Sequence, residues 1–131
     1  MRRAPTRARP RGPSPAPSTV DAGASAESAA TRLLLDHGYH IVERNFRCAA
    51  GEIDVIAREP EDTLVFVEVR SRADASHGHA AEMVDARKRR QVSRVADWYL
   101  AVRRPTYESV RFDVVAITGD DLQLIRDAWR L

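Results

Sequence analysis

Two apolar runs joined by a short polar link place the strongest constraint on the fold of this chain. Residues 51–70 read GEIDVIAREPEDTLVFVEVR, and the segments EIDVIAR (52–58) and TLVFVEVR (63–70) have the β-branched and aromatic content of strands. The link EPED is rich in turn-forming residues, so we expect an antiparallel hairpin. The sequence therefore predicts a fold built around a sheet that contains this hairpin.

The rest of the chain supplies helices and further strands. ASAESAATRLLLDHG predicts a helix over about 25–37, with Ser25 able to cap its start and Gly38 as its stop. The other predicted elements are strands at 39–46 and 110–118, a long helix over about 80–102, and a short strand followed by an irregular end within 121–129. The order α-β-β-β-α-β predicts an α/β fold in which a mixed central sheet is flanked by helices.

The N-terminal residues differ in composition from the rest of the chain. Residues 1–20 contain five arginines, five prolines and no acidic residue, which leaves 16 basic and 19 acidic side chains for residues 21–131. Such a segment buries too little apolar surface to offset its ordering entropy, so we expect a disordered tail at 1–22 and one domain at 23–131. Because the domain is not uniformly basic, any binding of nucleic acid must use a local patch.

Two features predict a cytoplasmic protein that does not contact a membrane. No stretch approaches the ~20 apolar residues of a membrane span, and no apolar segment follows the arginine-rich start as it would in a secretory signal. The single cysteine, Cys48, rules out an internal disulfide and suits a reducing compartment.

The predicted hairpin carries its charged residues at one end. Because side chains alternate along a strand, Glu52, Asp54 and Ile56 should share one face, and residues 64, 66, 68 and 70 one face of the next strand. If residue 58 pairs with residue 64, Asp54 lies directly opposite Glu68 on the same face. Opposed carboxylates repel unless a positive charge lies between them, so this pair indicates that a cation belongs to the design.

A divalent ion would resolve the repulsion between Asp54 and Glu68. Mg²⁺, or Mn²⁺ in its place, is held by one or two carboxylates together with a substrate phosphate, and Arg70 is placed to contact a phosphate oxygen. Two alternatives stay open. A register shift of one residue would separate the two acids, and Arg70 alone could neutralise Glu68 in an ordinary salt bridge. Glu52 could join the acidic cluster or lie outside it at the strand start.

These residues resemble the PD-(D/E)xK nuclease motif, which places an acid on one strand and acid–x–basic at the end of the next. Here the motif is spelled by Asp54 and by Glu68–Val69–Arg70. The stretches YHIVERNFR, GEID, FVEVR, VDARKRR and RFDVVAI together resemble the YraN-like uncharacterised bacterial family over roughly residues 23–127. That family is similar to archaeal Holliday-junction resolvases, which implies a restriction-endonuclease-like fold.

The resemblance implies roles for individual residues. The first-helix glutamate of the family corresponds to Glu27, although the glycine usual before it is Ala26 here. The metal-binding acids correspond to Asp54 and Glu68. In such nucleases the bound metal activates water and stabilises the developing charge, and Glu27 would be a further ligand or would orient the water. The basic position, usually lysine, is Arg70, which can bind phosphate but cannot accept a proton.

The predicted helix over 80–102 carries the other candidate phosphate-binding residues. Lys88, the only lysine of the chain, lies four residues from both Val84 and Val92, on the inward stripe of this helix. The family pattern also has lysine here, so we expect Lys88 to reach the carboxylates or a phosphate. The alternative is that its stem covers apolar surface. A candidate contact surface for a nucleic-acid backbone, as opposed to a plain solvated face, consists of Arg87, Arg89, Arg90 and Arg94.

Two classes of function are compatible with the sequence. One is a Mg²⁺-dependent, endonuclease-like protein that hydrolyses phosphodiester bonds in DNA, with branched DNA as a candidate substrate. The other is a non-catalytic module that binds nucleic acid or protein on the same fold. Because resolvases act as dimers, a homodimer is expected by analogy. The sequence does not distinguish DNA from RNA.

Overall fold

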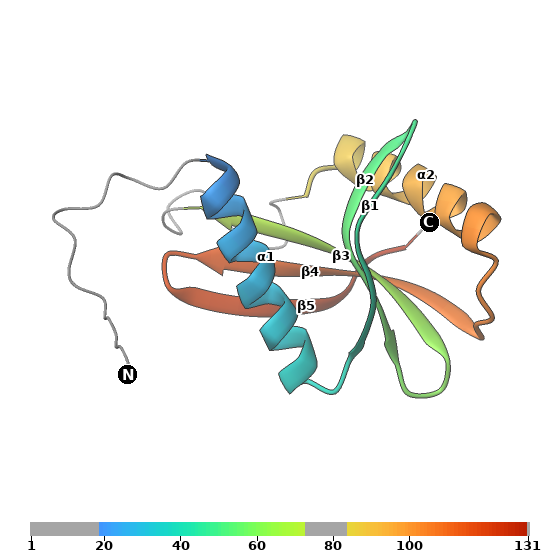
Figure 1. Cartoon of the computed structure of the whole chain (residues 1–131), viewed down its shortest axis with the longest axis horizontal. Helices are drawn as coiled ribbons and strands as arrows, with labels where there is room; N and C mark the ends of the chain where they lie inside the picture. Colours follow the sequence, from blue (N-terminus) through green and yellow to red (C-terminus); the bar gives the residue numbers. More distant parts are fainter. Residues whose placement is uncertain (1–18, 73–83, 131) are drawn as a thin grey trace, which may run out of the picture.

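The computed structural model describes residues 19–72 and 84–130 of the chain, which form five strands and two helices (Figure 1). Along the chain the elements are α1 (Thr19–Asp36), β1 (His40–Cys48), β2 (Gly51–Glu59), β3 (Thr63–Arg72), α2 (Ala86–Arg103), β4 (Ser109–Thr118) and β5 (Asp121–Trp129). The predicted α-β-β-β-α-β order is confirmed, and β5 follows it.

The five strands form one mixed sheet whose spatial order, β1-β2-β3-β4-β5, is also their order along the chain. All neighbouring pairs are antiparallel except β3 and β4, which run parallel because the segment containing α2 connects them. The expected α/β fold with a mixed sheet flanked by helices is therefore confirmed, and β3 is its central strand.

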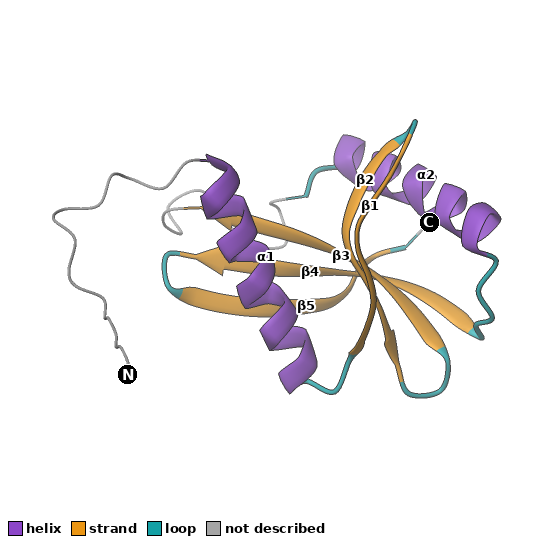
Figure 2. Cartoon of the chain, in the orientation of Figure 1, coloured by secondary structure: helices purple, strands orange, loops and turns teal. Residues whose placement is uncertain are grey.

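The two helices cover opposite faces of the sheet (Figure 2). Helix α1 packs Ala30 and Leu34 against one core cluster, which includes the β3 residues Val65 and Val67. Helix α2 packs against a second cluster that includes the alternate β3 residue Phe66. Residues 64–67 are apolar on both faces of β3 and are fully buried, as is typical of a central strand.

The hairpin register agrees with the prediction. Arg58 pairs with Leu64, and the turn contains only residues 60–62 because Glu59 also pairs with Thr63. The β2–β3 ladder ends at Val55 and Val67, however, so residues 54 and 68 lie one step beyond the last paired residues. The two strands stop pairing at the point where their carboxylates begin.

Four predicted details are wrong. Helix α1 begins at Thr19, so Ser25 lies inside the helix and does not cap it. Helix α2 begins at Ala86, because Asp85 accepts a hydrogen bond from the Lys88 backbone N–H and so caps the start. Val102 continues the spacing of Val92, Val95 and Tyr99, which predicts one buried stripe along this helix, yet Val102 is exposed. Strand β5 continues to Trp129, so the expected irregular end of 121–129 is part of the sheet.

The prediction of a disordered tail concerns residues 1–22, of which 1–18 lie outside the described residues. Helix α1 begins at Thr19, within the segment that was predicted to be the tail. Neither of the helices in the described ranges is long and apolar enough to cross a membrane.

Candidate functional site

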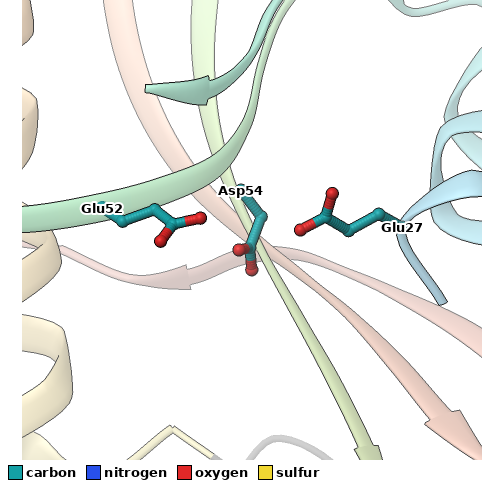
Figure 3. A group of neighbouring side chains, drawn as sticks. All are labelled: Glu27, Glu52 and Asp54. Atoms are coloured by element: carbon teal, nitrogen blue, oxygen red, sulfur yellow. The ribbon is translucent and has the colours of Figure 1, made fainter. Parts of the chain in front are cut away.

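Three carboxylates from α1 and β2 gather at one point of the structure. Glu27 comes from α1, and Glu52 and Asp54 come from β2; each offers an oxygen, and these oxygens all lie within 4.8 Å of one another. Figure 3 shows the three carboxylates pointing toward one another. The sequence predicted Glu27 and Asp54 as members of one site and left the place of Glu52 open.

A change of face within β2 brings Asp54 to this cluster. Strict alternation predicts that Ile53 and Val55 share a face, but Ile53 packs in the same core cluster as Ile56, while Val55 packs in the other. The alternation predicted for this strand is therefore wrong at its N-terminal half. Where the ladder to β3 has ended, the Val69 backbone N–H donates to Asp54 Oδ2 at 2.8 Å. The Asp54 carboxylate thus occupies the place where a backbone acceptor would have been.

The glycine of GEID lets the turn between β1 and β2 approach α2. Gly51 has φ of 139°, and a Cβ added there would lie 2.6 Å from Gln91 Nε2 and 3.4 Å from Val95 Cγ2. The Gln91 amide donates to the Ala50 carbonyl at 3.3 Å. This close contact fixes the start of β2, from which Glu52 and Asp54 project.

Glu68 of β3 lies beside this cluster and is almost fully buried, with 2% of its surface exposed. Lys88 Nζ of α2 lies 3.6 Å from Glu68 Oε2. Glu68 Oε1 has no hydrogen-bond partner within the described part of the chain. Burial, and after it the charge of Asp54, raise the pKa of Glu68 to about 7, against the opposing effects of Lys88 and Arg70.

The pKa of Asp54 is also raised, mainly because the carboxyl group is partly buried and so loses contact with water. The hydrogen bond from Val69 opposes this shift, whereas the charges of Glu27 and Glu52 reinforce it. Two neighbouring carboxyl groups with raised pKa values form a site that is short of positive charge. Such a site favours protons or a cation.

Two arginines of β1, which sequence reasoning missed, border the acidic cluster. Arg44 lies 3.9 Å from Glu27, and Arg47 lies 3.4 Å from Glu52. The β1–β2 register, which pairs Arg47 with Glu52, brings these side chains to the site. The alternation of Arg44 and Phe46 in YHIVERNFR does not predict this role, because the role depends on which strand pairs with β1.

Comparison with known proteins identifies the family. The sequence model of "Uncharacterised protein family UPF0102" matches residues 26–117. A UPF0102 protein of Moorella thermoacetica is 48% identical over 98 residues, which cover 75% of this chain and 81% of that protein. A UPF0102 protein of Cupriavidus metallidurans is 46% identical over 119 residues, covering 89% and 87%. This chain belongs to the UPF0102 family. The resemblance to YraN-like proteins is thereby confirmed.

The segment that matches UPF0102 contains all four candidate carboxylates and ends within β4. The matched segment also contains the predicted basic residues, which differ from one another in exposure and in contacts. Arg70 is half-buried and lines a pocket together with Val69 and Ser71. Among the described residues Glu68 forms its ion pair with Lys88, so the predicted alternative of an Arg70–Glu68 salt bridge is not what the structure contains.

The arginines of α2 also fall into two groups. Arg87, Arg90 and Arg94 are exposed, as a surface that contacts a nucleic-acid backbone requires. Arg89 is only partly exposed: its Nε donates to the Val84 carbonyl, and its guanidinium lies 5.8 Å from the centre of the Trp129 ring. Arg89 therefore also ties the start of α2 to the end of β5.

Proposed function

We propose that this UPF0102 protein is a metal-dependent nuclease-like protein that hydrolyses phosphodiester bonds in DNA. One observation carries the proposal: a buried carboxylate, Glu68, has an oxygen without a partner in the described structure and lies next to Asp54, whose carboxyl group is half-buried. A buried carboxylate whose charge is only partly compensated, here by Lys88 at one oxygen, is costly, so its presence favours a ligand that supplies positive charge.

The donor set suits a hard divalent ion. Carboxylate oxygens are the ligands that Mg²⁺ prefers, with Mn²⁺ as a substitute. Asp54 and Glu68 would hold the ion, and Glu27, whose oxygen lies within 4.8 Å of those of Asp54 and Glu52, is close enough to add a ligand or to orient water. When bound, such an ion supplies a Lewis acid and lowers the pKa of water.

The protein's own residues would position the substrate. The Val69 N–H holds Asp54 in a fixed orientation, which keeps the carboxylate in place without a moving part. Arg70, at the rim of the neighbouring pocket, would bind a phosphate oxygen through its guanidinium. Arg87 and Arg90, on the exposed side of α2, would contact the phosphate backbone and so set the register of the DNA. A homodimer would present two such sites to one branched DNA.

Cleavage assays on branched and linear DNA with Mg²⁺ or Mn²⁺ test this proposal. We expect Asp54→Asn and Glu68→Gln each to abolish cleavage while DNA binding persists, because each removes a charged ligand of the proposed ion but no contact to the backbone. Glu108→Gln is the matched control, since it removes an exposed carboxylate beside the start of β4, where Thr63 and Ser109 pair at the other end of the parallel strands. It should cleave like the wild type.

A non-catalytic nucleic-acid-binding module is the second candidate, because Arg70 replaces the lysine of the nuclease motif and cannot accept a proton. DNA binding of equal affinity with and without Mg²⁺, together with no cleavage of any tested substrate, would favour this candidate and reject the nuclease proposal.

A further inference from the structure

The ammonium group nearest to the candidate metal site comes from helix α2 and not from the nuclease-like motif. Lys88 Nζ lies 3.6 Å from Glu68 Oε2, and the other oxygen of the same carboxylate, Oε1, has no partner among the described residues. The contact is an ion pair at one oxygen and leaves half of the carboxylate available.

The start of α2 determines where Lys88 points. Asp85 accepts the Lys88 backbone N–H at 2.9 Å and fixes the first turn of the helix. Val92, four residues further along α2, is fully buried, and so is Val84, which lies just before the helix, so this side of the start of α2 is directed at the sheet. Lys88 nevertheless keeps 30% of its side chain exposed, so it is not enclosed in the core.

The distribution of charge leaves Lys88 with a specific task. Arg44 and Arg47 lie near Glu27 and Glu52, so these two acids already have arginine partners. Glu68 has Lys88 instead. An arginine fork binds a carboxylate through two parallel hydrogen bonds, whereas a lysine is a point charge on a flexible stem and can exchange one acceptor for another.

We infer that Lys88 serves two acceptors in turn: it neutralises Glu68 before a divalent ion is bound, and it donates to a phosphate oxygen of the substrate once the ion has taken over Glu68. This inference rests on the proposed function. Lys88 is thus a positioning residue. It holds the Glu68 carboxylate in place before the ion binds, and afterwards it helps to hold the phosphate. The division of labour also accounts for an arginine at position 70, since the flexible ammonium group is supplied by another element.

Two affinities of the full-length protein test the inference. The Lys88→Met variant should bind Mn²⁺ about tenfold more tightly at pH 8.5, because a positive charge that competes for Glu68 is gone. When both proteins are measured with Ca²⁺ in place of Mg²⁺, the same variant should bind branched DNA about tenfold more weakly than the wild type does, because a phosphate contact is lost. Isothermal titration with Mn²⁺ alone and fluorescence anisotropy of labelled DNA measure the two quantities.

Two further variants serve as controls. Arg87→Met removes an equal charge from the exposed side of the same turn; it should weaken DNA binding but leave the Mn²⁺ affinity unchanged. Lys88→Arg keeps the charge and should hold the Mn²⁺ affinity near that of the wild type. The opposite signs for metal and DNA are specific, because a merely structural loss in Lys88→Met would weaken both.

Each outcome is informative. An Mn²⁺ affinity of Lys88→Met that equals that of Arg87→Met, or that falls together with DNA binding, overturns the inference and leaves the proposed function intact. Absence of Mn²⁺ binding by the wild-type protein overturns the proposed function and the inference with it.

Discussion

The protein buries acidic side chains in two places on the same sheet, and the two places differ in how fully these acids are neutralised. One is the network around Asp113 of β4, in which each carboxylate has partners. The other is the site formed by Glu68 and its acidic neighbours, in which a buried oxygen has no partner within the described ranges. The difference separates a cluster that stabilises the fold from a cluster that is suited to bind something.

The Asp113 network is closed. Asp113 is fully buried and accepts hydrogen bonds from the Tyr39 hydroxyl at 2.7 Å, from Arg111 at 2.8 Å to each oxygen, and from the Asp127 backbone N–H at 2.9 Å. Arg111 also pairs with Glu59 at 2.6 Å. These contacts raise the pKa of Arg111, chiefly through the hydrogen bond to Asp113. The network joins β2, β4 and β5 to Tyr39, the residue that precedes β1.

At the Glu68 site, by contrast, the negative charges are not fully matched by positive ones. The pKa values of Asp54 and Glu68 are raised, and the Lys88 ammonium group lies near only one oxygen of Glu68. In a closed network the charges are matched, so removal of one partner leaves a buried charge. In the open site the acids repel one another already, so removal of one acid relieves the repulsion. The same type of substitution is therefore expected to have opposite effects on stability in the two regions.

The largest effect should come from breaking the closed network. We expect Arg111→Met to lower the free energy of unfolding by about 3–5 kcal/mol, because Asp113 and Glu59 lose their shared partner in a buried setting. Urea unfolding measures the change. Arg130→Met is the control: Arg130 is 82% exposed in its side chain and pairs with Asp127, so its loss should cost less than about 1 kcal/mol. Equal losses for the two variants would contradict a buried, matched network.

The next effect should come from the open site and have the opposite sign. Burial and the charge of Asp54 raise the pKa of Glu68 from 4.5 to about 7, so the folded state binds the proton more tightly than the unfolded state does. The contribution of this group to stability is thus full below about pH 4.5 and is lost as the pH rises through about 7.

Glu68→Gln mimics the protonated form and should remove this pH dependence. In EDTA at pH 8 the variant should be more stable than the wild type by on the order of 3 kcal/mol, and the two proteins should converge near pH 4.5. Urea unfolding of both proteins across this range measures the difference, in which the other titrating groups cancel. If the difference in the free energy of unfolding between the two proteins did not vary with pH, the pKa of Glu68 would not be raised in the folded state.

Much of the fold could be predicted from local sequence patterns. The register of the β2–β3 hairpin followed from the short turn around Pro60, and the apolar residues on both faces of 63–70 indicated a central strand. The boundaries that were wrong depend on neighbours instead. Val102 fits the helical stripe, but α2 extends beyond the sheet there, and residues 121–129 become a full strand only because β4 pairs with them.

The candidate site was predictable in composition and less so in geometry. Asp54 and Glu68 were expected to face each other across a regular ladder, yet the ladder ends one step earlier and Asp54 takes a backbone donor of β3. Local alternation cannot anticipate such a change of face, because twist and the end of pairing are properties of the whole sheet. Arg44 and Arg47 were missed for the same reason, since their role depends on the pairing of β1.

The smallest of the expected stability effects also separates the two regions most directly. A ligand that binds only the folded state adds about 1.4 kcal/mol of stability at a concentration ten times its Kd. We expect Mn²⁺ at pH 8 to raise the melting temperature of the wild type accordingly, and to do so less at pH 5.5, where Glu68 holds its proton and competes with the ion. Asp54→Asn should abolish the response, because it removes a carboxylate shared by the Glu27–Glu52 group and the neighbourhood of Glu68.

Tyr39→Phe, which removes one donor of the Asp113 network, should melt earlier and yet respond to Mn²⁺ as the wild type does. Differential scanning fluorimetry with and without the ion compares the three proteins. If Asp54→Asn were stabilised as much as the wild type, the ion would bind elsewhere. The open site would then be, like the Asp113 network, a feature of the fold alone, with a proton in the place of a metal.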